Sequence, residues 1–316
     1  MKLSELNDKK ALIIASSGGH LLEAIHISRK FNLSDQSIYI SHENPQSYSL
    51  LRHKPHYFVN NVRSRDWMGA IKIVPLLLKI AKNEDFEVII STGAAIAISA
   101  TPIKFIFRKP YLYFESITRI RKPSMAGKIL EFFPFIHRYS EHGKNFGKKW
   151  KVSPSILEDF CVKSAERKTK PLQILVTLGT ISNYRFDRLV DTLLRIIDSG
   201  DIVYWQLGCT TREGLPGVTC QTIANEEMIE IAKKCDVVVS HGGIGTILDL
   251  ISLGIRPIVL PRQSALNEHI DNHQNEAAVI FEGLDLVQIL SDNPKREELV
   301  SATSKKIDPG VLSQEY

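Results

Sequence analysis

Short apolar runs that end in glycine or small polar residues recur along the whole sequence. In the first half these runs are ALIIA (11–15), SIYIS (37–41), EVIIS (87–91) and PYLYFE (110–115). Helical patterns separate them at 20–31, 67–82, 95–107 and 124–133. Buried strands that alternate with helices are typical of parallel βαβ winding. The pattern therefore predicts a doubly wound α/β domain in the first half.

The same rhythm restarts after a polar, charged stretch at 151–172, which is the best candidate for a linker. We expect strands at 173–179, 202–208, 237–240 and 257–261, and helices at 185–198, 225–234 and 245–253. The tail at 285–316 is expected to be helical. We therefore predict two tandem Rossmann-like α/β domains, one over residues 1–165 and the other over residues 166–316.

Charge divides the chain at nearly the same place. Residues 1–170 hold 28 lysines and arginines against 15 aspartates and glutamates, whereas residues 171–316 hold 12 against 20. A basic half suits an anionic membrane surface or a diphosphate-bearing substrate, although two solvated faces are the simpler alternative. Aromatic residues do not interleave with the basic ones in a nucleic-acid-binding motif, so no nucleic acid partner is expected.

Composition excludes several other classes of protein. No apolar run approaches the roughly 18 residues of a transmembrane helix, and the N-terminus MKLSELNDKK lacks the apolar core of a signal peptide. The four cysteines are scattered without CxxC spacing, which predicts reduced thiols and a cytoplasmic protein. His269 and His273 have the spacing of a helical ligand pair, but no third ligand is evident, so no metal is expected.

Parallel α/β sheets bind ligands beyond the carboxyl ends of their strands. Here those ends carry SSGGH (16–20), STGA (91–94), ES (115–116), LGT (178–180), QLG (206–208) and SHGGIGT (240–246). Because glycine recurs at strand ends in both halves, we expect one cleft between two facing domains.

SHGGIGT follows an apolar strand and opens a helix, and the free N–H groups of a helix N-terminus suit a diphosphate. These residues and those near them have simpler alternative roles. The glycines could form a tight turn, Thr180 could cap a helix or lie in a turn, and Asp249 could be an exposed helix carboxylate. The expected donor-binding residues in this part of the chain are Gly179, Thr180, Gly208, His241, Gly242, Gly243, Gly245, Thr246 and Asp249.

The polar segment 261–278 follows a strand and precedes a helix, where a substrate loop belongs. His273 and Gln274 could orient the hydroxyls of a donor sugar. Arg262 could pair with a carboxylate, which favours glucuronic acid as the donor sugar over galactose, glucose or N-acetylglucosamine. Its alternative partners are phosphate and solvent.

His20 begins the first helix, and we expect the helix dipole to lower its pKa, as a neutral general base requires. A partly buried structural histidine is the alternative. Glu115 ends a strand and precedes a basic run, so it is a second catalytic candidate, with a surface charge cluster as the alternative reading. The expected acceptor-binding residues are Ser17, Gly18, Gly19, Thr92, Gly93, Ser116 and Arg119.

Together these motifs resemble a lipid-linked sugar transferase family. The second half, through VTLGT (176–180), SHGGIGTILDL (240–250) and DNHQNEAA (271–278), is similar to the donor-binding subunit of the two-subunit N-acetylglucosaminyltransferase of the dolichol pathway. The first half, through SSGGHLLEA (16–24) and YFESITRIRKPSMAGKIL (113–130), resembles its membrane-associated partner. Bacterial exopolysaccharide pathways have similar paired or fused transferases, some of them glucuronosyltransferases.

The resemblance implies a GT-B glycosyltransferase that inverts the anomeric centre, needs no metal or other cofactor, and moves a sugar from a UDP-sugar to a polyprenyl-diphosphate-linked saccharide. It places Gly243, Gly245 and Thr246 at the diphosphate, Asp249 at the ribose and His20 at the acceptor as base. The membrane anchor of the dolichol-pathway partner has no counterpart in this sequence. A peripheral site on the inner face of the cell membrane would rest on the basic first half and an apolar patch.

Two further functions stay open. A UDP-sugar 2-epimerase shares the two-domain architecture, although such enzymes usually need additional carboxylates in the cleft. A non-catalytic subunit that binds UDP-sugars is the other alternative.

Overall fold

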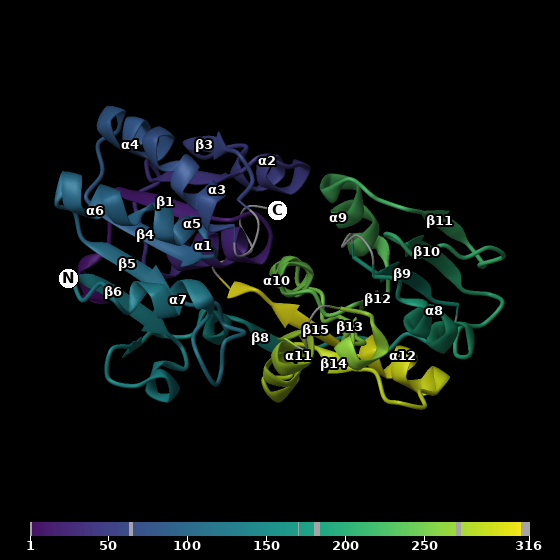
Figure 1. Ribbon diagram of the computed structural model, residues 1–316. Coiled ribbons are helices and arrows are strands. Elements are labelled where there is room, and N and C mark those ends of the chain that lie inside the picture. Colours follow the sequence, from purple (N-terminus) through teal and green to yellow (C-terminus); the bar gives the residue numbers. More distant parts are fainter. Residues whose placement is uncertain (1, 63–65, 170, 180–183, 270–272, 311–316) are drawn as a thin grey trace. The chain divides into compact units, whose positions relative to one another are not determined.

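The structure is a computed structural model that describes residues 2–62, 66–169, 171–179, 184–269 and 273–310, with the backbone alone at Trp67 and His273 (Figure 1). The chain forms two compact units, Met1–Glu158 and Asp159–Tyr316. The second unit therefore begins seven residues before the expected boundary. The reason is that β8 (Cys161–Ser164) pairs antiparallel with β15 (Lys305–Asp308) near the other end of the chain.

Unit 1 contains a seven-stranded parallel sheet in the order β3-β2-β1-β4-β5-β6-β7 (Figure 1). Its strands are β1 (Ala11–Ala15), β2 (Ile38–His42), β3 (His56–Val59), β4 (Val88–Gly93), β5 (Tyr111–Phe114), β6 (Ile136–Ser140) and β7 (Lys151–Val152). Strand order reverses between β1 and β4. Such a reversal opens a crevice at the carboxyl ends of the two strands, where ligands of open α/β sheets bind.

Prolines divide two of the helices expected in unit 1. The expected helices at 67–82 and 95–107 each form two shorter ones, because Pro75 and Pro102 lie in the first turns of α4 and α6, where no N–H is needed. The helices are α1 (Gly19–Lys30), α2 (Pro45–Leu51), α3 (Trp67–Lys72), α4 (Val74–Asn83), α5 (Ile96–Ser99), α6 (Thr101–Phe107) and α7 (Met125–Leu130), with 3-10 turns at Leu3–Glu5, Gly143–Phe146 and Ile156–Asp159. Leu77, Ile96 and Leu130 bring α4, α5 and α7 into one core against the sheet.

Unit 2 contains a six-stranded parallel sheet in the order β11-β10-β9-β12-β13-β14. Its strands are β9 (Gln173–Thr177), β10 (Ile202–Gln206), β11 (Val218–Cys220), β12 (Val237–Ser240), β13 (Ile258–Val259) and β14 (Gln288–Ile289). Its helices are α8 (Asp187–Leu194), α9 (Asn225–Lys234), α10 (Ile244–Ser252), α11 (His273–Gly283) and α12 (Arg296–Ala302), with a 3-10 turn at Ser264–Leu266. Here the strand order reverses between β9 and β12.

The architecture confirms the predicted pair of doubly wound α/β domains. The expectation of a helical tail at 285–316 was wrong, because β14 and β15 flank α12 there, and residues 311–316 lie outside the described part. Gln288 and Ile289 of β14 pair with Ile258 and Val259 of β13, a contact between segments that are distant in sequence. A strand of two residues is too short to show the alternation by which strands are recognised.

Candidate functional site

His20 lies at the switch point of unit 1. It is the second residue of α1, which follows β1 directly, and it packs against Gly93 at the end of the neighbouring strand β4. Gly93 has a φ of +111°, and a Cβ at this position would lie 3.0 Å from Cε1 of His20. Glycine at position 93 therefore both permits the backbone conformation and leaves room for the imidazole. The turns SSGGH and STGA meet here.

A buried carboxylate stands behind His20. Oε2 of Glu23, one helical turn further along α1, lies 3.6 Å from Nδ1 of His20. The Glu23 side chain is 3 % exposed, and Nδ1 is shielded from solvent, whereas the His20 side chain as a whole keeps 30 % of its surface. Glu23 was not among the residues expected from the sequence. Its spacing of three from His20 on a helix is the signal that could have found it.

The pKa of His20 shifts in the direction opposite to our expectation. Burial acts to lower this pKa, but the nearby carboxylate of Glu23 and the charge of Glu115 together outweigh it. The pKa of His20 therefore lies above its ordinary value. The expectation from the helix dipole failed because it took no account of carboxylates so close to the imidazole.

Glu115 is buried directly after β5 and holds the backbone around it. Its Oε1 accepts hydrogen bonds from Tyr113 Oη (3.1 Å) and the Ser116 amide (3.2 Å), and its Oε2 accepts one from the Ser124 amide (2.8 Å). Burial raises the pKa of Glu115, while the hydrogen bonds from Ser124 and the charge of Arg119 oppose the rise. Glu115 thus holds the loop that leads into α7 in place.

Two of the expected acceptor-binding hydroxyls are turned toward α1. Thr92 Oγ1 donates to the carbonyl of His20 at 2.6 Å, and Ser116 Oγ donates to Oε1 of Glu23 at 2.7 Å. Both residues are buried, so in this structure they support His20 and Glu23. The remaining expected acceptor-binding residues besides Gly93 keep partial exposure: Ser17, Gly18, Gly19 and Arg119.

His241 occupies the corresponding switch point of unit 2. It follows β12, and its imidazole is packed between Gly179 and Gly243, where added Cβ atoms would lie 2.6 and 2.4 Å from Nε2. Nδ1 lies 3.4 Å from the carbonyl of Thr177. Burial and the charge of Arg262 lower the pKa of His241 to about 4, so the imidazole is neutral near pH 7. Glycine is therefore needed at positions 179 and 243, because the His241 ring between them leaves no space for a Cβ atom.

The first turn of α10 is open at its N-terminus. Gly243 is the N-cap and provides no side-chain cap, and Gly243, Gly245 and Thr246 are all partly exposed. The first N–H groups of a helix have no partner within the helix, so this turn offers amide donors to an anion. Asp249 lies further along α10 and is buried, with 2 % of its surface exposed.

Gln206, at the end of β10, was missed from the sequence. Its Oε1 accepts from Thr177 Oγ1 (2.8 Å) and the Gly179 amide (3.2 Å), and its Nε2 donates to the carbonyls of Gly179 (3.2 Å) and Gln221 (3.0 Å). A single buried amide thereby fixes the Gly179 turn. The turn also approaches Gly208 closely, because a Cβ on Gly208 would lie 2.1 Å from the Gly179 carbonyl oxygen. Gly208 thus supports the turn by its lack of a side chain.

Arg262 is engaged within unit 2 and is 1 % exposed. Its Nη1 donates to the carbonyls of Tyr184 (2.8 Å) and Glu268 (2.9 Å), and its Nη2 donates to the carbonyl of Leu178 (2.6 Å). The guanidinium also lies over the ring of Phe186, 4.6 Å from the centroid. These contacts correct the expectation that Arg262 is available to a donor carboxylate.

The segment after Arg262 is tied to its backbone. Gln274 Oε1 accepts from the Arg262 amide at 3.3 Å, and Asn275 Nδ2 donates to the Arg262 carbonyl at 3.1 Å. Gln274, expected at the donor sugar, is thus 9 % exposed and already hydrogen bonded. Thr180 and the side chain of His273 lie outside the described residues.

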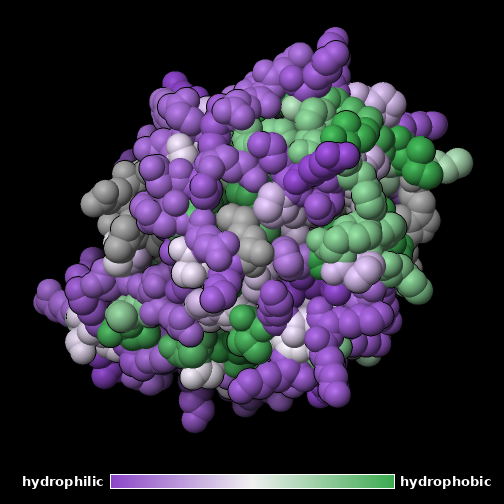
Figure 2. All heavy atoms as spheres, turned by 90° about the vertical axis from the view of Figure 1, so that its left-hand side faces the viewer, coloured by the Kyte–Doolittle hydropathy of each residue, from purple (hydrophilic) through white to green (hydrophobic). Residues whose placement is uncertain are grey.

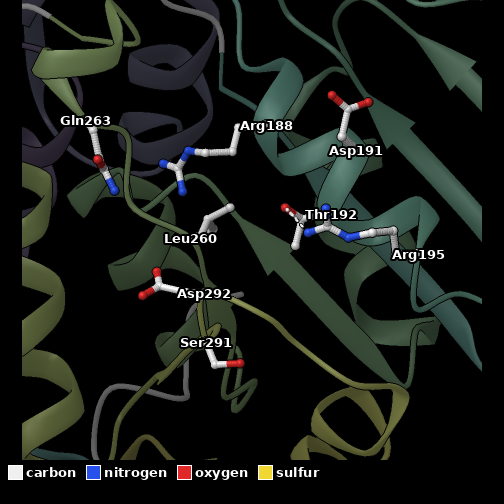
Figure 3. Close-up of a pocket in the computed structure, with 8 residues that line it drawn as sticks. All are labelled: Arg188, Asp191, Thr192, Arg195, Leu260, Gln263, Ser291 and Asp292. Atoms are coloured by element: carbon white, nitrogen blue, oxygen red, sulfur yellow. Dashed lines mark hydrogen bonds between the residues drawn. The ribbon is translucent and has the colours of Figure 1, made fainter.

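A polar pocket of about 490 Å³ lies elsewhere in unit 2 (Figure 3). Arg188 at its edge forms a bidentate ion pair with Glu268 and also donates to the Pro261 carbonyl. The Asp191 carboxylate forms an ion pair with Arg212. The lining residues are Arg188, Asp191, Thr192, Arg195, Leu260, Gln263, Ser291 and Asp292. None of the expected donor-binding residues is among them.

An apolar groove of about 660 Å³ opens on helices α3 to α7 of unit 1, which we call the outer helices. Ile71 from α3, Phe105 and Ile106 from α6 and Phe133 beyond α7 contribute to its walls, and the first three are more than half exposed. Figure 2, which faces the side of Figure 1 where α4 and α6 lie, shows hydrophobic side chains gathered on this surface. Exposed apolar patches of this kind are common where proteins bind a lipid surface, a partner protein or a ligand.

The outer helices also carry a uniform charge. Helices α3 to α7 contain Lys72, Lys79, Lys82, Lys104 and Lys128 and no aspartate or glutamate. In the part of the chain that the structure describes, no helix combines the length and apolarity needed to cross a bilayer. Within the same residues, no three His, Cys, Asp or Glu side chains are grouped to hold a metal ion.

Comparisons with known proteins bear on the fold and on unit 2. Residues 210–309 match the model of the glycosyltransferase family 28 C-terminal domain. A search of curated proteins gives no match. MurG of Acinetobacter baumannii is 15 % identical, with 92 % of this chain and 89 % of that chain covered and a TM-score of 0.52.

Two further solved structures have the same fold. Arabidopsis thaliana UGT89C1, solved with UDP-L-rhamnose, is 12 % identical over 97 % of this chain and 90 % of that chain, with a TM-score of 0.57. A Listeria monocytogenes protein described as a putative UDP-N-acetylglucosamine 2-epimerase is 12 % identical over 97 % and 93 %, with a TM-score of 0.53. The chain therefore has the GT-B fold, and its second unit carries a match to the C-terminal domain of family 28 glycosyltransferases.

Proposed function

We propose that the chain is an inverting, metal-independent glycosyltransferase that moves a sugar from a UDP-sugar to a polyprenyl-diphosphate-linked saccharide. The observation that carries the proposal is the pairing of His20 with the buried Glu23 at the switch point of unit 1. A second support is the open first turn of α10 within the segment that matches the family 28 domain.

His20 is the proposed general base. Nδ1 faces Glu23, which leaves Nε2 to accept the proton of the acceptor hydroxyl as the hydroxyl oxygen attacks the anomeric carbon. The imidazolium that forms is stabilised by the carboxylate behind it, and the proton passes to solvent when the product leaves. UDP departs from the opposite face of the sugar, so the configuration inverts.

The proposed seat of the departing diphosphate is the first turn of α10. Its amide donors and the positive end of the helix dipole stabilise the negative charge that develops on UDP. His241 beside this turn is neutral, so the fixed dipoles carry the stabilisation. Asp249, expected at the ribose, would need to become accessible to make that contact, because it is buried here.

We propose that the donor is a UDP-sugar, and we assign no preference among the hexoses it could carry. The preference for glucuronic acid rested on Arg262, whose guanidinium is already bound to three backbone carbonyls. We therefore give glucuronic acid no advantage over galactose, glucose or N-acetylglucosamine.

The acceptor is proposed to reach the enzyme from an anionic bilayer, at the cytoplasmic face of a bacterial cell membrane where exopolysaccharide or capsule units are assembled. The groove between the outer helices of unit 1 offers apolar side chains for insertion at the level of the lipid headgroups. The lysines of the same helices, with no carboxylate among them, complement anionic lipid. Attachment would thus be peripheral.

The test is a panel of UDP-sugars offered with polyprenyl-diphosphate saccharides in membrane extract. We expect transfer of one sugar to the lipid fraction, with inverted configuration and with activity retained in chelator. A change of the UDP-sugar itself without any lipid acceptor would instead indicate a 2-epimerase, an activity compatible with the fold shared with the Listeria protein. Tight binding of UDP with no turnover of any kind would indicate a binding subunit.

A further inference from the structure

The two oxygens of the Glu23 carboxylate have different partners. Oε1 accepts the hydroxyl of Ser116 at 2.7 Å and the amide of Ile117 at 3.3 Å. Oε2 faces Nδ1 of His20 at 3.6 Å. Both hydrogen bonds to Oε1 come from the segment that follows β5. This segment therefore sets the orientation of the carboxylate and the position of Oε2 relative to the imidazole.

Ser116 is itself held in place from two sides. Its amide donates to Oε1 of Glu115 at 3.2 Å, and its Oγ lies 3.2 Å from Oγ1 of Thr118. Ser116 is 8 % exposed, and the hydrogen bond from its hydroxyl to Glu23 is shorter than the one from the Ile117 amide. A hydroxyl buried and fixed in this way is directed inward, to Glu23.

The Glu23 carboxylate would have room to move without this hydroxyl. A hollow of about 10 Å³ adjoins it, lined also by Glu141 from the end of β6 and by Glu115. The apolar walls of the hollow, among them Phe31 and Phe114, offer the carboxylate no hydrogen bond. Near Glu23 lie His20, on its own helix, and the two glutamates that follow β5 and β6.

We propose that Ser116 is a positioning residue: its hydroxyl fixes the Glu23 carboxylate so that Oε2 stays against Nδ1 of His20. This inference rests on the proposed function, in which His20 is the base, and it replaces the expectation that Ser116 binds the acceptor. Loss of the hydroxyl leaves Glu23 with the longer bond from Ile117 alone. The carboxylate then turns toward the hollow and away from Nδ1, which weakens its hold on the imidazolium.

The test is an NMR titration of the histidine ring protons in the wild-type chain and in Ser116→Ala. The chain has ten histidines, so the signal of His20 is assigned by its loss in His20→Gln. We expect the midpoint of the His20 titration to fall by roughly half to one pH unit in Ser116→Ala and to return in Ser116→Thr. Should Ser116→Ala fail to fold, Ser116→Cys keeps the volume with a weaker donor, and the same fall is expected.

The matched control is Ser37→Ala, just before β2, which also removes a buried hydroxyl, one that accepts a hydrogen bond from the Ala11 amide at 3.0 Å. This control should leave the His20 midpoint unchanged. An unchanged midpoint in folded Ser116→Ala would overturn the inference, as would a loss confined to the KM for the acceptor.

The titration needs no turnover, so it is separable from the proposed function. A wild-type chain that transfers no sugar while Ser116→Ala still lowers the His20 midpoint would defeat the proposed function and leave the contact between Ser116 and Glu23 intact. Where transfer is observed, we expect kcat of Ser116→Ala to fall roughly 10-fold, with the KM for the UDP-sugar unchanged.

Discussion

His20 and Glu23 lie one turn apart on α1, with Nδ1 of the imidazole 3.6 Å from Oε2 of a carboxylate that is 3 % exposed. A buried carboxylate beside an imidazole favours the charged form of the imidazole, and it also fixes which nitrogen faces the substrate. The pairing therefore helps to raise the pKa of His20, and in the proposed reaction it leaves Nε2 for the acceptor hydroxyl.

Glu23→Gln removes the charge but keeps the shape of the side chain. Because the raised pKa of His20 depends on that charge, the acid limb of the kcat profile should move to lower pH, and kcat at its plateau should fall roughly 100-fold. The measurement is kcat against pH for both proteins. An acid limb that stays in place would show that a different group is titrating.

Glu141 is expected to make stability depend on pH. Burial, with the charges of Glu23 and Glu158, raises the pKa of Glu141 from 4.5 to about 7, against the hydrogen bonds from Ser155 and Ile156. Between these values the folded chain binds more protons than the unfolded chain, so this contribution to stability is lost as the pH rises from 4.5 to about 7.

Glu141→Gln stays neutral at every pH and should escape this loss. Its melting temperature relative to the wild type should therefore be higher near pH 8 than near pH 4.5, in thermal unfolding followed by circular dichroism. An equal difference at the two pH values would contradict the assignment.

Arg262 is predicted to be a structural residue. Arg262→Gln should lower the free energy of unfolding by roughly 2–4 kcal/mol, because backbone carbonyls at Tyr184, Leu178 and Glu268 lose a charged, buried donor. Denaturant unfolding measures this loss. The relative kcat/KM for UDP-glucuronate and UDP-glucose should remain as in the wild type, and a selective loss with glucuronate would restore Arg262 to the donor site.

Gly243→Ala tests the packing around His241. The added Cβ would lie 2.4 Å from Nε2 of the imidazole, so the ring must move and the first turn of α10 must move with it. We expect UDP to bind roughly 10-fold more weakly, as measured by calorimetry. Gly283→Ala is the control, since nothing lies within 4 Å of the Cβ added there. Equal affinities in the two variants would argue against a diphosphate seat at α10.

The apolar groove is tested by vesicle binding. Ile106→Asp places a charge on a side chain that is 60 % exposed, and the variant should sediment with anionic phospholipid vesicles roughly 5-fold less than the wild type. Val279→Asp makes the same kind of change at a 63 % exposed position in unit 2 and should bind as the wild type does. Loss of binding in both variants would point to a general effect of charge.

The sequence predicted the strands on which the site is built, because buried parallel strands are continuous apolar runs. It could not predict β14 or β15, whose pairing partners lie far along the chain. The division of two helices at Pro75 and Pro102 was missed, although a proline is a local signal for such a division. The glycines were recognised at the right turns, but the role of Gly179 and Gly243 depends on the His241 ring between them.

Electrostatics and side-chain direction account for the other differences. The pKa of His20 is raised by Glu23, which is its neighbour on α1, and by Glu115, which comes near it only in the folded chain, so the expectation from the helix dipole alone was wrong. Arg262 follows a strand, where sequence favours a ligand contact, but two of the carbonyls that accept from it belong to the distant residues Leu178 and Tyr184. Such contacts have no local signature.

The central claim is that His20 is the base of a sugar transfer, and it is tested most directly by His20→Ala. We predict that transfer from the UDP-sugar to the lipid-linked acceptor falls roughly 1,000-fold or more while the Kd for UDP, measured by calorimetry, stays near that of the wild type. A His20→Ala variant that transfers sugar at the wild-type rate would contradict the account.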